Sequence, residues 1–309
     1  MLDPTELAQA IRTANPAIDP VVAHTTADAE KLITEARVVL TSSFLAGDIN
    51  ERLFHNADQL EWVQTLTSGV DAYDLQSLRR QGAIVTNVRG IHAEPIAQQV
   101  FAYILAFERD LLRAIQQHTE SIWHRYTADE LTDKTLGILG VGSIGERAAE
   151  LAKAFGMRTA GVKTTVTSEI DVVDELYTPD KQHKMLEQAD YVLISCPLNS
   201  DTKGLIDYNS FVDMKSDAVL INIGRGEIIH ESDLIQAIKN DLIGGAALDV
   251  FDTEPLPTDS DLWDHPKVII TPHNAGSTSQ YWRRCAEIFA SNFELFQNEE
   301  YDNMDNRIL

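Results

Sequence analysis

The stretch Lys134-Thr-Leu-Gly-Ile-Leu-Gly-Val-Gly-Ser-Ile-Gly145 contains the pattern on which the fold assignment depends. Residues 135–139 form a short apolar run that is typical of a buried strand, and glycines follow at once in the spacing G-x-G-x-x-G. Residues 146–155 then carry apolar side chains at helical spacing. A strand, a glycine turn and a helix in this order predict a dinucleotide site, because such glycines permit a tight turn, a close backbone approach to a pyrophosphate and close packing of the helix on the strand.

The turn is also expected to supply the contacts to the phosphates. The first N–H groups of a helix are unpaired and lie at the positive end of its dipole, so they attract phosphate groups. The alternative is an ordinary strand–turn–helix unit of an α/β protein with no ligand. The residues of the turn expected to contact the cofactor are Gly140, Gly142, Ser143, Ile144 and Gly145.

Strand and helix patterns alternate along most of the 309 residues. Before the glycine turn, strands are expected at 21–25, 37–41, 60–66 and 83–88, and helices at 4–14, 28–36 and 74–81. After the turn, strands are expected at 157–162, 190–196, 218–223, 244–250 and 268–271, and helices at 179–188, 208–214, 231–240 and 277–297. The alternation predicts a small parallel sheet and a six-stranded one wound on both faces, connected by one long amphipathic helix over 95–117.

The composition is that of a globular protein with a strongly acidic surface. Hydrophobic residues make up 44% of the chain, and the formal charge of −23 gives a pI of about 4.6. This charge argues against binding to nucleic acid or to an anionic membrane, both of which require a basic surface. The acidic residues are spread along the chain, which fits either an ordinary well-hydrated surface or adaptation to a salty cytoplasm.

Targeting and redox signals point to the cytoplasm. No apolar run approaches the roughly 20 residues of a membrane span, and the first residues lack the basic and apolar regions of a signal peptide. Two cysteines, Cys196 and Cys285, do not make a disulfide framework and have no metal-type spacing, so we expect reduced thiols and no metal site.

The end of the second strand of the dinucleotide unit indicates which cofactor is used. NAD sites carry an acidic residue about 20 residues beyond the glycines, where it binds the adenosine ribose. Here Lys163, Thr164 and Thr165 occupy this region, and no carboxylate occurs before Glu169. A cation with hydroxyl donors suits a 2′-phosphate, which predicts NADP(H). The alternative is that Lys163 is a solvated loop residue and that NAD(H) serves as well.

Three later stretches carry candidate catalytic residues. Arg225 lies between two glycines just beyond an apolar strand, where it can offer a bidentate fork to a carboxylate. Asp249 closes another strand, and Glu254 precedes a proline. His273 follows a strand and a proline, so Glu254 and His273 together suggest a carboxylate-supported imidazole.

These patterns together resemble the D-isomer-specific 2-hydroxyacid dehydrogenase family over about residues 60–298. The segments that carry the resemblance, in the family's order, are Gly140-x-Gly142-x-x-Gly145, Asn222-x-x-Arg225-Gly226, Leu248-Asp-Val-Phe-x-x-Glu254-Pro-Leu-Pro257 and Thr271-Pro-His273-x-Ala-Gly276. The resemblance implies a Rossmann-type dinucleotide-binding domain at 95–276, inserted into a smaller flavodoxin-like substrate domain at 1–94 and 277–309. It also implies a homodimer.

The resemblance implies roles for the site residues. Arg225 would bind the carboxylate and carbonyl of the substrate, His273 would be the general acid or base, and Glu254 its partner. Asp249 and the carbonyl of Ile223 would hold the nicotinamide carboxamide. Cys196 and Pro197 belong to a segment similar to the family's adenosine loop, and Ser68, Gly69 and Val70 to one similar to its carboxylate-binding loop.

The expected activity is the reduction of 2-oxo acids to D-2-hydroxy acids, with hydride from NADPH and a proton from His273. A glyoxylate or hydroxypyruvate reductase is an alternative with the same chemistry. Formate dehydrogenases share the scaffold, but their pattern has glutamine where this chain has Glu254. An alternative of another class is a non-catalytic NAD(P)H-sensing protein like the corepressors that use this fold.

Overall fold

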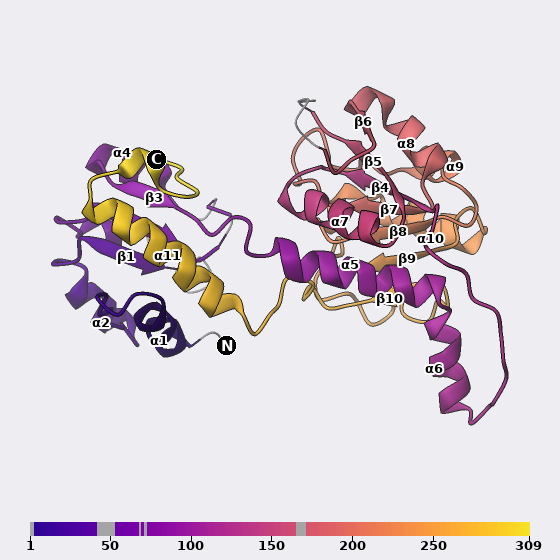
Figure 1. The fold of residues 1–309 in the computed structure, drawn as a ribbon, viewed down its shortest axis with the longest axis horizontal. Helices are drawn as coiled ribbons and strands as arrows, with labels where there is room; N and C mark the ends of the chain where they lie inside the picture. Colours follow the sequence, from indigo (N-terminus) through magenta and orange to yellow (C-terminus); the bar gives the residue numbers. More distant parts are fainter. Residues whose placement is uncertain (1–2, 42–52, 68, 71–72, 165–170) are drawn as a thin grey trace. The chain divides into compact units, whose positions relative to one another are not determined.

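The computed structural model describes residues 3–41, 53–67, 69–70, 73–164 and 171–309. The chain divides into two compact units, one of Met1–Ile91 with Thr278–Leu309 and the other of His92–Ser277 (Figure 1). The roles of substrate domain and dinucleotide-binding domain stay predictions for these units. No helix among the described residues has the length and apolar character needed to cross a membrane.

The larger unit is built on a seven-stranded parallel sheet of order β10-β9-β8-β7-β4-β5-β6. Its strands are β4 (Thr135–Leu139), β5 (Arg158–Val162), β6 (Glu175–Tyr177), β7 (Tyr191–Ile194), β8 (Val219–Asn222), β9 (Gly245–Leu248) and β10 (Val268–Ile270). The strand order reverses between β4 and β7, and open α/β sheets bind their ligands beyond the carboxyl ends of the strands at such a point. The predicted number of six strands was wrong because β6 is a three-residue strand without a buried residue and gives no clear pattern.

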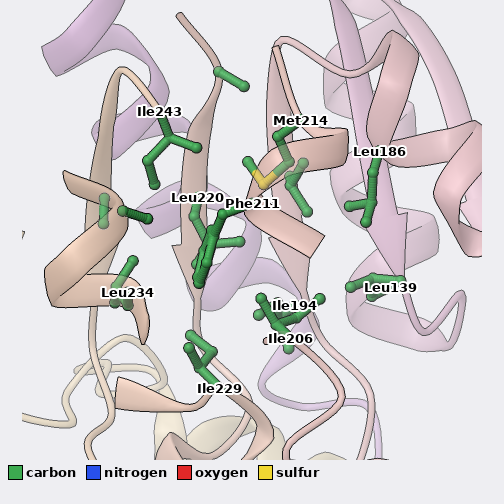
Figure 2. Close-up of a cluster of buried hydrophobic side chains, with 14 of the residues drawn as sticks. Leu139, Leu186, Ile194, Ile206, Phe211, Met214, Leu220, Ile229, Leu234 and Ile243 are labelled. Carbon is green, nitrogen blue, oxygen red and sulfur yellow. The ribbon is translucent and has the colours of Figure 1, made fainter. Parts of the chain in front are cut away.

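Helices cover both faces of this sheet, as the sequence predicts. The helices of this unit are α5 (Ala93–Glu108), α6 (Leu111–Thr119), α7 (Ser143–Ala154), α8 (Gln182–Gln188), α9 (Tyr208–Asp213) and α10 (Glu231–Lys239), with 3₁₀ turns η2 (Pro179–Lys181) and η3 (Gly226–Ile228). All of these α-helices except α6 bury side chains. Side chains of α5 and α7 pack with Leu193 and Ile221 on one face. On the other face Leu220 packs with Phe211 of α9 and Leu234 of α10 (Figure 2).

This alternation of burial explains why the core strands are continuously apolar. Neighbouring residues of a strand point to opposite faces, and both faces here are covered by helices. Each fully buried Leu, Ile or Phe contributes roughly 1.5–3 kcal/mol to the free energy of folding. The resulting core fixes the ends of the strands, from which the candidate site residues extend.

The long helix predicted over 95–117 is two helices. α5 ends at Glu108 and α6 begins at Leu111, because Asp110 between them adopts a left-handed backbone with φ 50°. Among the residues of α6 none is buried, and Ile115 is 62% exposed. The apolar stripe read from the sequence therefore faces the core only as far as α5, and Figure 1 shows α6 extending away from the sheet.

The smaller unit has a three-stranded parallel sheet of order β1-β2-β3 in its described residues. Its elements are α1 (Pro4–Ala14), α2 (Thr26–Leu32), β1 (Val38–Thr41), β2 (Trp62–Thr65), α4 (Leu75–Gln81), β3 (Ile84–Thr86), α11 (Tyr281–Gln297) and η4 (Tyr301–Asn303). Helices α1 and α11 share one apolar cluster with β2, in which the ring of Trp62 stacks on that of Phe289 at 5.0 Å.

The strand predicted at 21–25 is absent, since these residues are irregular coil. Val21 is 76% exposed, and none of the residues 21–25 is buried. Thr25 instead begins α2: its side chain accepts from the N–H of Asp28, whose carboxylate accepts from the N–H of Thr25. This reciprocal capping box stabilises a helix start and competes with an extended conformation.

The two ends of the larger unit are held together. Nδ1 of His92, at its beginning, lies 3.3 Å from the carbonyl oxygen of Gly276, near its end. The chain therefore enters and leaves this unit at neighbouring points.

Candidate active site

The turn between β4 and α7 requires glycine at two of its positions. Gly140 has φ +96°, and a Cβ there would lie 2.5 Å from the backbone nitrogen of Cys196. A Cβ on Gly145 would lie 2.7 Å from the carbonyl oxygen of Gly140 and 2.9 Å from Ile138. These contacts bring the first turn of α7 against β4 and against the segment after β7, where the hydroxyl of Ser195 donates to the Gly140 carbonyl at 2.9 Å.

Gly142 differs from these two glycines because open space surrounds it. A Cβ there would meet no described atom within 4 Å, and Gly142 is the N-cap of α7 without a side-chain capping bond. The N–H groups of Ser143, Ile144 and Gly145 form the first turn of this helix and have no partner within it. An open helix N-terminus beside a residue without a side chain fits a dinucleotide pyrophosphate. Beside it, Cys196 is partly buried and Pro197 exposed.

Lys163, directly after β5, lies close to the same helix start. Its Nζ is 3.7 Å from Oε1 of Glu146, and the two side chains are 30% and 42% exposed. Thr164 is exposed, and Thr165 lies outside the described residues. Sequence analysis missed Glu146, although its place in the first turn after the glycines could have indicated it.

The segment after β8 holds Arg225 by its neighbours. The side chain of Asn222, fully buried, donates from Nδ2 to the Arg225 carbonyl at 3.0 Å and accepts from the Gly224 N–H at 3.0 Å. A Cβ on Gly226 would lie 1.9 Å from the carbonyl carbon of Phe251, so this segment is pressed against the one that follows β9. Asn222 appeared in the sequence motif without a role, and the structure identifies it as the residue that shapes the turn.

His273 and Glu254 form the pair that the sequence predicts. Nδ1 of His273 lies 2.7 Å from Oε2 of Glu254, and Oε1 of Glu254 accepts from the Phe251 N–H at 3.1 Å. His273 is 51% exposed in its side chain and has a left-handed backbone with φ 49°. Because Nδ1 faces the carboxylate, Nε2 is left as the ring nitrogen that can exchange a proton with a ligand.

The electrostatics of Glu254 link it to both other candidates. Burial alone would raise the pKa of Glu254, but hydrogen bonds from His273 and the Phe251 N–H, with the charges of His273 and Arg225, lower it overall. The carboxylate therefore stays ionised at a lower pH than an ordinary glutamate does, and the charge of Arg225 contributes to this. An ionised partner on Nδ1 holds the imidazole in one tautomer and orientation.

Asp249, 2% exposed, binds the backbone on which His273 sits. Its Oδ1 accepts from the Asn274 N–H at 3.0 Å and its Oδ2 from the Ala275 N–H at 2.9 Å. Its carbonyl accepts from the His273 N–H at 2.8 Å. The structure thus adds a positioning function to the nicotinamide contact that the family resemblance implies.

The remaining predicted residues are less fully connected. Ile223 is buried at the end of β8, while Gly69 and Val70 belong to the smaller unit and Ser68 lies outside the described residues. Contacts of these residues with substrate or cofactor stay predictions. No group of three or more His, Cys, Asp or Glu side chains in the described part of the chain could hold a metal ion.

Comparisons with known proteins show which family the chain is similar to. Residues 101–275 match the model of the D-isomer specific 2-hydroxyacid dehydrogenase, NAD binding domain. The chain is 35% identical over 272 residues to D-3-phosphoglycerate dehydrogenase of Bacillus subtilis, covering 84% of this chain but only 49%, about half, of that protein. It is 34% identical to a glyoxylate reductase of Aeropyrum pernix, covering 90% of this chain and 86% of that one.

A solved structure supports the same assignment over almost the whole chain. A D-isomer specific 2-hydroxyacid dehydrogenase family protein from Aeromonas salmonicida superposes with a TM-score of 0.84 at 34% identity, covering 99% of this chain and 96% of that one. The chain therefore belongs to the family of D-isomer specific 2-hydroxyacid dehydrogenases.

Proposed function

We propose that this protein reduces 2-oxo acids to D-2-hydroxy acids, with NADPH as the preferred cofactor. The observation that carries the proposal is the 2.7 Å contact between His273 and Glu254, with the charge of Arg225 acting on the same carboxylate. A carboxylate-supported imidazole beside a guanidinium can deliver a proton and stabilise negative charge on an oxygen. The nicotinamide, when bound, supplies the hydride.

The proposed roles of the chain's own residues follow from their atoms. The guanidinium of Arg225 binds the carboxylate of the 2-oxo acid and polarises its carbonyl. Nε2 of His273 donates a proton to the carbonyl oxygen as the alcohol forms. Nδ1 keeps its own proton and donates it in a hydrogen bond to the carboxylate of Glu254. Asn222 and Asp249 hold the two segments in place, so little reorganisation is required during the reaction.

The contact proposed for the Gly69 and Val70 N–H groups with the carboxylate is tested separately by Gly69→Pro, which should raise KM.

The preference for NADPH rests on Lys163. Its ammonium lies at the end of β5 within 3.7 Å of the first turn of α7, and residues 158–168 contain no carboxylate. A cation there attracts a 2′-phosphate, and the nearby carboxylate of Glu146 offsets only part of its charge. NAD(H) remains the alternative cofactor and belongs in the same experiment.

Glyoxylate is the first substrate to test. A relative of similar length, from Aeropyrum pernix, is named a glyoxylate reductase. Initial rates with glyoxylate, hydroxypyruvate, pyruvate and 2-oxoisocaproate, each with NADPH and NADH, test both parts of the proposal. Turnover with NADPH preferred supports it. Turnover with NADH preferred refutes only the proposed role of Lys163 in NADPH preference and leaves the proposed reaction standing. Cofactor binding without turnover on any acid refutes the enzymatic function in favour of a sensing protein.

His273→Ala is the variant that tests the mechanism. Loss of the general acid should lower kcat roughly 10²–10⁴-fold, with the affinity for NADPH little changed. His265→Ala is the matched control, since His265 lies in the same unit outside the proposed site. Equal rates for wild type and His273→Ala would remove this residue from the mechanism.

We further propose that the protein acts as a cytoplasmic homodimer. Both cysteines are free thiols. Trp123 is 96% exposed, and Ile115 and Ile122 nearby in the chain are 62% and 49% exposed, which is apolar surface suited to an interface. Light scattering should give twice the chain mass, and Trp123→Glu should reduce it; a wild-type monomer would refute the dimer.

A further inference from the structure

A chain of hydrogen bonds reaches from the middle of α5 to the candidate general acid. The hydroxyl of Tyr103, a residue 2% exposed, bonds to Oγ1 of Thr271 just beyond β10, and Thr271 donates to Oδ1 of Asp249. A carboxylate can only accept here, so the direction is fixed: Tyr103 donates to Thr271, and Thr271 donates to Asp249. All three residues belong to the larger unit.

Asp249 connects these hydrogen bonds to the backbone of the loop that contains His273. Its two carboxylate oxygens accept from the N–H groups of Asn274 and Ala275, at 3.0 and 2.9 Å. Its carbonyl accepts from the His273 N–H. The loop is thus held on both sides of a histidine whose left-handed backbone is costly for a residue with a side chain. Such a conformation persists where its surroundings over-determine it.

We infer that Tyr103 is a positioning residue for His273, acting through Thr271 and Asp249. This inference rests on the proposed function. None of the sequence motifs contains Tyr103, and the residue is almost fully buried. The Tyr103 hydroxyl donates a hydrogen bond to the oxygen of Thr271. The Thr271 hydroxyl is thereby held in the orientation in which it donates its own hydrogen to Asp249. Three of the roughly four acceptor positions of that carboxylate are occupied by protein donors, so its orientation is tightly defined.

Removal of the Tyr103 hydroxyl should loosen the loop without emptying the site. Tyr103→Phe leaves Thr271 free to rotate and to seek another partner, so Asp249 and the His273 backbone lose their fixed arrangement. Small misplacements of a catalytic group are costly in rate. We expect kcat for glyoxylate with NADPH to fall about tenfold, while the Kd of NADPH, measured by its fluorescence, stays within about twofold of wild type.

Tyr191→Phe is the matched control. Tyr191 is also a buried tyrosine of the larger unit, and its hydroxyl donates to Glu108, at the opposite end of the strands. Its loss removes a comparable buried hydrogen bond with no route to His273, so kcat should be unchanged. Thr271→Val should reproduce the effect of Tyr103→Phe, and Thr271→Ser, which keeps the hydroxyl, should restore most of kcat.

A second measurement does not depend on turnover. The imidazole resonances of His273 in the protein without cofactor, assigned with His273→Asn, should show a protected Nδ1 proton in wild type and Tyr191→Phe. In Tyr103→Phe and Thr271→Val this proton should exchange faster and its signal broaden. Equal kcat and equal spectra for Tyr103→Phe and Tyr191→Phe would overturn the inference, as would a change in KM alone. A wild-type protein that turns over no 2-oxo acid would refute the proposed function, while the spectra would still decide the positioning role.

Discussion

At the scale of single residues, the pair of Lys163 and Glu146 bears most directly on cofactor choice. The ammonium lies 3.7 Å from a carboxylate of the first helical turn, so part of the positive charge offered to a 2′-phosphate is already compensated. The separation and exposure of the pair make it weak, since exposed pairs contribute about 0–1 kcal/mol. A doubly charged phosphate should therefore displace Glu146 from Lys163.

Glu146→Gln should tighten the binding of NADPH a few-fold and leave NADH nearly unchanged. The variant removes a negative charge near the proposed phosphate position, and one unit charge at about 4 Å in water is worth about 1 kcal/mol. Lys163→Gln should act in the opposite direction, again on NADPH only. Fluorescence titration with both cofactors measures this, with Glu150→Gln as the control, since Glu150 pairs with Arg147 on the same helix. Parallel shifts in both affinities would contradict the assignment of Lys163.

The two thiols should differ in reactivity with pH and with cofactor. Burial raises the pKa of Cys196, and it raises that of Cys285 to about 12. A thiol whose pKa is higher in the folded than in the unfolded protein stabilises the folded state. This stabilisation is fully present below the unfolded pKa of about 8.5 and is lost as the pH rises towards the folded pKa. Alkylation with iodoacetamide at about pH 9 should therefore spare Cys285 until urea is added.

Cys196 should react slowly in the same experiment, and more slowly still with NADPH present. It adjoins the glycine turn, where a Cβ on Gly140 would touch it. Mass spectrometry of peptides from both thiols reads the two outcomes together. Rapid labelling of Cys196 at saturating NADPH would place the cofactor away from this loop.

At the scale of elements, the turn from β4 into α7 contains one glycine that is needed for packing and one that is expected to serve ligand binding. Gly145→Ala would bring a Cβ to 2.7 Å from a backbone oxygen, so overpacking should lower stability by about 1–3 kcal/mol. Gly142→Ala meets no described atom within 4 Å, so its unfolding midpoint should match wild type while NADPH binding weakens markedly. Urea denaturation and NADPH titration of both variants test this. Wild-type NADPH affinity in Gly142→Ala would show that no phosphate approaches the turn.

Local patterns predicted the elements that bury their side chains on a covered sheet. The strands after the glycine turn are apolar runs bounded by turns, and β4 matches its prediction at both ends. The patterns failed where burial did not decide the structure. The segment at 21–25 pairs with no strand in the described part of the chain. The stripe through Ile115 continues past Asp110, although none of the residues of α6 is buried.

The same distinction applies to the candidate site. His273 and Glu254 could be paired from sequence because each follows a strand of the same sheet and carries complementary chemistry. Tyr103 and Thr271 could not, since 168 positions separate them and the tyrosine resembles any other buried residue of an amphipathic helix. Long-range hydrogen bonds between ordinary residues leave no local pattern.

At the scale of the whole molecule, the charge of −23 is the dominant property. Repulsion between like charges destabilises a compact state, and salt screens it. The midpoint of thermal unfolding should rise between about 0.1 and 0.5 M KCl, where the Debye length falls below about 10 Å. Calorimetry with NaCl as the comparison salt measures this. A midpoint that falls or stays constant would argue against adaptation to a salty cytoplasm.

The contact between His92 and Gly276 has a consequence for how this molecule can be rebuilt. Because His92 and Gly276 are close together, residues 92–277 form a cassette whose two ends lie at neighbouring points. A short flexible bridge in its place would leave the flanking segments continuous, and joined ends are what make domain insertion tolerable. Exchange of this cassette for that of a relative with the opposite cofactor preference should transfer the preference as one block, through two junctions.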